Sequence, residues 1–148
     1  MWGMLISVIS GILMSVQGVF NSEVTKQTGV WIAAAFVQVT AFIVCMAAWF
    51  ITGRESGFGE VVLARPVYLL SGGIIGAFIT YTVIIGMNTL GPAQSVIFII
   101  TAQIISAYLI ELLGLFGVEK SQFHWTKLLG VILMAAGIII FKWKDLRQ

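Results

Sequence analysis

Five long runs of apolar residues occupy most of this chain, and they constrain its fold more than any other feature. They cover roughly residues 2–21, 30–52, 67–87, 92–113 and 128–141. A helix needs about 20 mostly apolar residues to cross the hydrocarbon core of a bilayer. The last run is short, but it reaches 19 residues when it is extended from Trp125 to Trp143. Only 9% of the residues are charged, whereas soluble domains carry ~25%, so the sequence predicts an integral membrane protein.

The backbone of these runs is expected to be helical, because hydrocarbon offers no water to satisfy the polar groups of an open strand. The tryptophans support the boundaries, since indole rings favour the headgroup level and all of them lie near predicted ends. They are Trp2, Trp31, Trp49, Trp125 and Trp143. We therefore predict an all-α membrane protein with five transmembrane helices in a single domain, residues 1–148.

Small residues recur at helical spacing on two of the predicted helices. Gly72 and Gly76 are four residues apart on the third helix, and Gly130 and Gly137 are seven apart on the fifth. Such spacing places small residues on one face, where helix backbones can approach closely within a bilayer. We expect these four glycines to mark faces on which helices pack.

Polar side chains inside the predicted spans are the candidate substrate-binding residues. An amide without a partner is costly in hydrocarbon, so such groups should face other helices or a wet cavity. Gln103 lies at the middle of the fourth helix, at the depth where transporters often bind their substrates. The alternative is that these groups join helices by hydrogen bonds, and for Gln17 and Asn21 the sequence leaves both interpretations open. The candidates are Gln17, Asn21, Gln38, Tyr81, Gln103 and Ser106.

Glu111 borders the fourth predicted span and is the candidate for ion or proton coupling. A partly dehydrated carboxylate can exchange a proton during transport. The competing interpretation is an interfacial residue, two positions from the end of its helix, that simply reaches water. The sequence alone does not separate the two.

The basic residues are evenly divided between the two sides of the membrane that five spans would define. One side has Arg54, Arg65, Lys120 and Lys127, and the other has Lys26, Lys142, Lys144 and Arg147. A membrane protein is oriented by an excess of Lys and Arg on the cytoplasmic side, and four against four provides no excess. We predict dual topology, with copies inserted in both orientations and an antiparallel homodimer of ten helices as the working unit.

The sequence contains no constellation typical of an enzyme or a cofactor site. The single cysteine, Cys45, excludes an intrachain disulfide, and no cluster of His and Cys has the spacing of a metal site. The single histidine, His124, lies in a predicted loop, so no nucleophile has a positioned base. No basic and aromatic stretch suggests nucleic acid. We expect no enzymatic activity, no cofactor and no metal, and the partners to be the bilayer, a second copy and a small molecule.

Several motifs resemble those of one known family. They are the pattern Gly11…Gln17-x-x-x-Asn21, the run Ala102-Gln103…Ser106…Glu111…Gly114-Leu115-Phe116-Gly117, and the closing Leu129-Gly130…Ala136-Gly137 helix. Over essentially its whole length the chain is similar to the YdcZ family of bacterial inner-membrane proteins, which is grouped with the drug/metabolite transporters. The resemblance implies an antiparallel two-subunit transporter. Where the family commonly has Asp followed by His, this chain has Glu111 and Leu112, so a proton relay through that histidine is not implied here.

The hypothesis that accounts for these features is a small-molecule secondary transporter, an exporter of the bacterial inner membrane. It would work by alternating access in an antiparallel homodimer, as transporters with inverted repeats do. Two alternatives stay open. One is a dual-topology small-ion channel, although no span carries a ring of charge. The other is a non-transporting subunit of a membrane assembly, which would leave the deep glutamines without a purpose.

Overall fold

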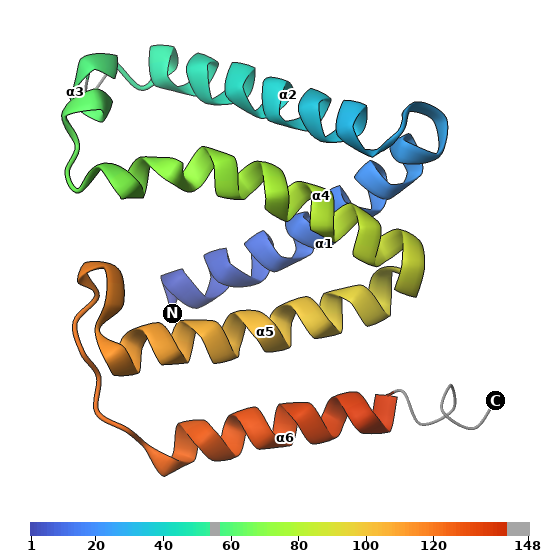
Figure 1. Cartoon of the computed structure of the whole chain (residues 1–148), viewed down its shortest axis with the longest axis vertical. Coiled ribbons are helices and arrows are strands. Elements are labelled where there is room, and N and C mark those ends of the chain that lie inside the picture. The colour runs from blue at the N-terminus through green and yellow to red at the C-terminus, as the bar shows by residue number, and fades with distance from the viewer. Residues whose placement is uncertain (54–56, 142–148) are drawn as a thin grey trace. The chain divides into compact units, whose positions relative to one another are not determined.

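The computed structural model describes residues 1–53 and 57–141, and all regular structure in these residues is helical (Figure 1). The α-helices are α1 (Trp2–Thr28), α2 (Val30–Ile51), α3 (Phe58–Leu63), α4 (Gly72–Leu90), α5 (Pro92–Leu113) and α6 (Trp125–Phe141). Two short 3₁₀ segments, Val67–Ser71 and Leu115–Gly117, precede α4 and follow α5. Five residues used in the topology and boundary predictions lie outside the described residues: Arg54, Lys142, Trp143, Lys144 and Arg147.

In the part of the chain that the structure describes, four helices are long and apolar enough to cross a membrane. They are α1, α2, α5 and the continuous segment Val67–Leu90 that contains α4. The apolar helix α6 is shorter, with 17 residues. The prediction of an all-α membrane protein is confirmed at this level, while the fifth crossing and the antiparallel homodimer remain predictions.

The first helix continues beyond its predicted end at Asn21 and stops at Thr28. Nothing in this stretch breaks a helix, and Glu23 and Lys26 form an ion pair of 2.6 Å on its surface, one turn apart. The helix ends because Gly29 adopts a φ of 88°, which residues with a side chain rarely take. Counting apolar residues missed these last two turns or so, because residues 22–28 are polar except for Val24.

The chain divides into two compact units, Met1–Pro92 and Ala93–Gln148, and the single domain stays a prediction. In the first unit α1, α2 and α4 all contact one another. Their buried side chains lie at one end, in the second halves of α1 and α4 and the first turns of α2. This closed end contains the apolar residues Ala33, Ala34, Ile84 and Met87.

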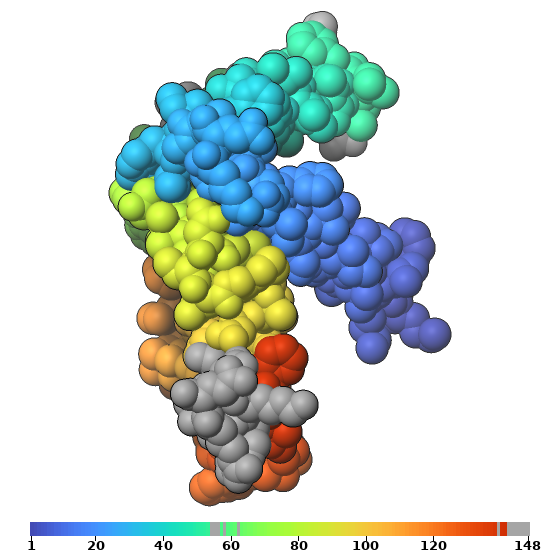
Figure 2. Space-filling model, turned by 90° about the vertical axis from the view of Figure 1, so that its right-hand side faces the viewer, coloured from blue at the N-terminus to red at the C-terminus, as the bar shows by residue number. Residues whose placement is uncertain are grey.

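The opposite end of this unit is open. Along the first half of α1 every side chain through Met14 is exposed, and so are those from Ala41 to Cys45 on α2. Figure 2 shows these two stretches, in dark blue and in cyan, diverging from each other. Because α1 diverges from α2 beyond the closed end, a widening space lies between these two helices.

The second unit consists of α5 and α6, which run antiparallel (Figure 1). The chain leaves α5 through Gly114 and Gly117, both at positive φ. A side chain at Gly114 would be strained there and would also crowd Lys120, whose Cβ would lie 3.2 Å from the added carbon. The backbone N–H of Ser121 then donates to the carbonyl of Glu111 at 2.9 Å, which fixes the connection against the end of α5.

Candidate functional site

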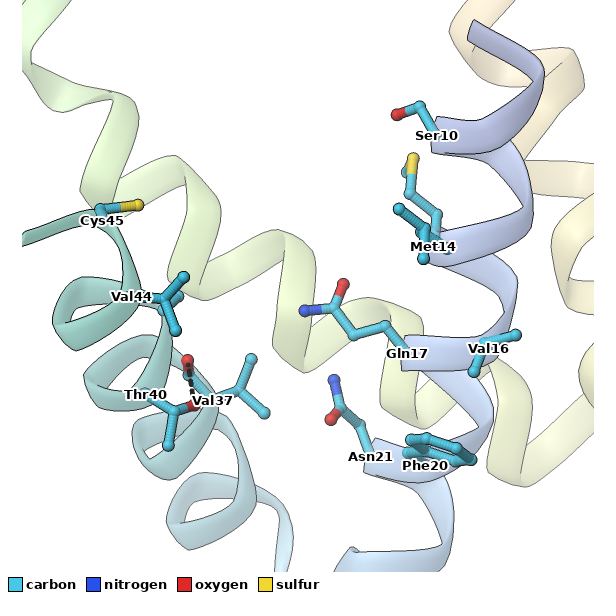
Figure 3. A pocket seen from close by; sticks show the side chains of 12 residues that line it. Ser10, Met14, Val16, Gln17, Phe20, Asn21, Val37, Thr40, Val44 and Cys45 are labelled. Atoms are coloured by element: carbon cyan, nitrogen blue, oxygen red, sulfur yellow. Dashed lines mark hydrogen bonds between the residues drawn. The ribbon is translucent and has the colours of Figure 1, made fainter. Parts of the chain in front are cut away.

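An open groove lies between α1 and α2 in the first unit (Figure 3). Its volume is about 620 Å³. The walls are mostly apolar, and polar atoms enter them at a few positions along the two helices. The lining residues are Ser10, Leu13, Met14, Val16, Gln17, Phe20 and Asn21 from α1, with Val37, Thr40, Ala41, Val44 and Cys45 from α2.

Two amides, those of Gln17 and Asn21, project into this groove from successive turns of α1, and Figure 3 shows both pointing towards α2. Gln17 is exposed, whereas Asn21 is 8% exposed and lies next to the closed end of the unit. Within the described part of the chain, neither side chain has a hydrogen-bond partner. Their donors and acceptors are therefore free to bind water, a ligand or another chain. Such a partner is expected, because an unpaired amide is costly in apolar surroundings.

The α2 side of the groove has fewer polar groups available to a ligand than its sequence indicates. Thr40 lines the groove, but its hydroxyl donates to carbonyls of its own helix, at 2.9 Å to Phe36 and 3.0 Å to Val37. A hydroxyl that is already hydrogen-bonded within its own helix contributes little to ligand binding. The polar chemistry of the groove therefore comes chiefly from α1.

Two predicted binding residues, Gln38 and Tyr81, lie in the interface between α2 and α4 and do not line the groove. Gln38 donates from Nε2 to Thr80 Oγ1 on α4 at 3.4 Å, and Gly76 provides room for its amide, which would lie 3.7 Å from an added Cβ. Tyr81 stacks on Trp31, with ring centroids 4.5 Å apart and planes at 21°. Both residues contribute to the packing of α2 on α4.

The remaining predicted binding residues belong to the second unit. Gln103 and Ser106 are both exposed on α5. Within the first unit the structure brings Gln17 and Asn21 to one groove, and a role for Gln103 and Ser106 in binding stays a prediction.

Glu111 forms an ion pair with Lys127 at the first turn of α6. The distance from Glu111 Oε2 to Lys127 Nζ is 3.0 Å, and each side chain is 46% exposed. Lys127 Nζ also lies 5.2 Å from the centroid of the Tyr108 ring. A paired, half-exposed carboxylate near the end of its helix favours the interfacial interpretation of Glu111 over the coupling one.

The sequence analysis missed a polar network that joins α1 to α4. Ser22 Oγ donates to Asn88 Oδ1 at 2.5 Å, and Asn88 Nδ2 donates to Thr25 Oγ1 at 3.1 Å. Thr25 Oγ1 in turn donates to the carbonyl of Ser22 at 2.7 Å. Ser22, Thr25 and Asn88 all lie just outside the predicted spans 2–21 and 67–87, so the sequence did not indicate that they would meet.

Among the glycines, the close approach of helices occurs at Gly18, which was not predicted. A Cβ added to Gly18 would collide with the thioether of Met87 on α4. At Gly72, Gly130 and Gly137 an added Cβ would meet nothing within 4 Å in the same chain. A packing role for those three would need a surface outside their own unit, such as a second copy.

The long apolar helices and the comparison with known sequences define the class as a multi-pass protein of the inner membrane. The chain belongs to the family described as "Putative inner membrane exporter, YdcZ", whose profile matches residues 2–140. It is similar to "Inner membrane protein YdcZ" of Escherichia coli (strain K12), with 24% identity over 132 residues, which are 88% of this chain and 87% of that protein. No solved structure matches it. The family resemblance drawn from the sequence motifs is thus confirmed.

Proposed function

We propose that this protein is a secondary exporter and that the groove between α1 and α2 forms part of its solute passage. One observation carries the proposal: Gln17 and Asn21 direct unpaired amides into a groove whose other walls are largely apolar. Ligand sites commonly combine apolar walls with a few polar groups that orient the ligand. The family description as an exporter supports the same direction.

The lining of the groove indicates the class of solute. None of its residues is charged, so a small inorganic ion would lose its hydration without a countercharge. Leu13, Phe20 and Val44 offer apolar contact, while the two amides offer donors and acceptors at one end. A neutral or weakly polar amphipathic molecule fits this distribution best.

The packing of the first unit suggests how the passage opens and closes. At the closed end the network of Ser22, Thr25 and Asn88 joins α1 to α4, and at the other end α1 and α2 diverge. Alternating access would come from rocking about the closed end, with Gln17 and Asn21 next to the pivot. In our proposal a second, antiparallel copy covers the open side of the groove.

Dual topology is tested by placing a reporter at the C-terminus and measuring which compartment it occupies. Comparable signal from both sides of the membrane is expected, because the basic residues provide no asymmetry. A signal confined to one side would contradict the antiparallel homodimer and leave the groove to be covered in another way.

The transport proposal is tested in proteoliposomes loaded with a panel of neutral amphipathic dyes and the aromatic cation ethidium. Saturable efflux of at least one probe is expected. Gln17→Leu should lower it about fivefold, since one hydrogen bond contributes ~1 kcal/mol. Gln27→Leu is the matched control, because it makes the same change on an exposed turn of α1 outside the groove.

The single cysteine provides a second measurement on the same preparation. Cys45 is free, exposed and part of the groove lining. A membrane-impermeant maleimide should label it, and a transported probe should slow the labelling. Efflux that does not saturate and is accompanied by electrical conductance would indicate a channel, and absence of any flux would indicate a non-transporting subunit.

A further inference from the structure

The second unit has a cavity of its own between α5 and α6, with a volume of about 520 Å³. Its charged residues stand together at one end, where α5 finishes and α6 begins. The rest of the lining is apolar. The residues are Tyr108, Glu111 and Lys127 at the charged end and Ile104, Ala107, Gly130, Val131 and Met134 beyond it.

The depth of this cavity matches part of one leaflet. From Glu111 to Ile104 along α5, and from Lys127 to Met134 along α6, the lining runs inward for seven residues on each helix. At 1.5 Å per residue this is about 10 Å. One leaflet contributes ~15 Å of hydrocarbon, half of the ~30 Å core. An apolar chain entering at the charged end would therefore stay within one leaflet.

The charged end presents both signs of charge side by side. Lys127 Nζ lies 3.0 Å from Glu111 Oε2 and 5.2 Å from the centre of the Tyr108 ring. The Tyr108 hydroxyl accepts the backbone N–H of His124 at 3.2 Å, which positions the ring. Both charged side chains are about half exposed, so the ion pair between them is weak. Each can leave the other and pair with a charged group of a ligand.

We propose that this cavity binds one phospholipid with an ethanolamine headgroup. Its phosphate would pair with Lys127 and its ammonium with Glu111, so each charge that leaves the Glu111–Lys127 pair gains an opposite charge. One acyl chain would occupy the apolar part of the cavity. This site goes beyond the proposed transport function and does not depend on it.

The charges also argue against an anionic lipid in the same place. A phosphatidylglycerol headgroup supplies a phosphate for Lys127 but no cation for Glu111. The carboxylate would then lose its partner next to an added negative charge. The site should consequently prefer the zwitterionic headgroup over the anionic one when the acyl chains are the same.

The test measures lipid retention by the purified full-length protein. The protein is delipidated in mild detergent and given an equimolar mixture of phosphatidylethanolamine and phosphatidylglycerol with identical acyl chains, and native mass spectrometry counts the lipids bound. Wild type should retain one phosphatidylethanolamine per chain in preference. Glu111→Gln and Lys127→Gln should each lower that retention about tenfold, the effect of one charge-assisted hydrogen bond.

Two further variants make the result specific. Gly130→Leu should abolish retention of both lipids, since a side chain there has open space within the chain and would fill the cavity. Glu23→Gln should change nothing, because it breaks the exposed ion pair with Lys26 on α1, and neither residue lines this cavity.

Three outcomes would overturn the proposal. The first is equal retention of the two lipids by wild type. The second is lipid retention at the wild-type level both in Gly130→Leu and in at least one of the two charge variants, each tested separately and shown by circular dichroism to be folded. The third is retained lipid in Gly130→Leu together with a change in oligomeric state, which would identify a second copy of the chain as the occupant. If Glu111→Gln does not fold, Lys127→Gln and Gly130→Leu decide the question.

Discussion

Replacing Asn88 by leucine removes both side-chain hydrogen bonds that join α4 to α1. These are the bond from Ser22 Oγ, at 2.5 Å, and the bond to Thr25 Oγ1, at 3.1 Å. Hydrogen bonds between membrane helices contribute ~0.6 kcal/mol on average. The two together should therefore contribute about 1.2 kcal/mol to the free energy of unfolding, and Asn88→Leu should lose about that much.

The loss should not be larger, because the partners have alternatives. Thr25 Oγ1 already donates to the carbonyl of Ser22 at 2.7 Å and keeps that bond in the variant. The Ser22 hydroxyl can turn to a carbonyl of its own helix, as Ser7 and Ser15 do in α1. Neither hydroxyl is thus left without an acceptor, which limits the penalty to the lost interhelical bonds.

The measurement is reversible unfolding in mixed detergent micelles, followed by circular dichroism. In a double-mutant cycle, Asn88→Leu is one change and the pair Ser22→Ala with Thr25→Val is the other. The coupling energy between the two changes should be about 1 kcal/mol. Thr89→Val is the control, since this neighbouring hydroxyl bonds only to carbonyls of its own helix. A coupling energy near zero, or a loss in the control as large as that in Asn88→Leu, would refute the conclusion that this network joins the two helices.

Two other contacts of the first unit lead to predictions with the same assay. Gly18→Ala should be less stable than Gly11→Ala by about 1 kcal/mol, because the flexible but buried thioether of Met87 must shift away from the new methyl group, whereas the methyl group at Gly11 meets open space. Replacing Tyr81 by leucine should lose about 0.5–1.5 kcal/mol from the stack on Trp31, and Tyr81→Phe should retain most of it. Equal stabilities within either pair of variants would mean that the contact does not contribute to packing.

The amino-acid sequence was sufficient to predict the class of this protein and the positions of most of its helices. Apolar runs of membrane-spanning length in a chain with 9% charged residues leave few alternatives to membrane helices. Hydropathy is a local property, so each helix could be located without knowing its neighbours. The motifs around Gln17 and Gln103 were also sufficient for the family, which the comparison confirms.

Which polar residues come together was decided by the tertiary structure. Gln17, Gln38 and Asn88 are all amides on apolar helices, and nothing local separates them. The rotation of each helix about its axis directs Gln17 into the groove, Gln38 against Thr80, and Asn88 between Ser22 and Thr25. That rotation depends on packing between segments distant in the chain, such as Gly18 against Met87, and the spacing of residues along one helix does not contain it.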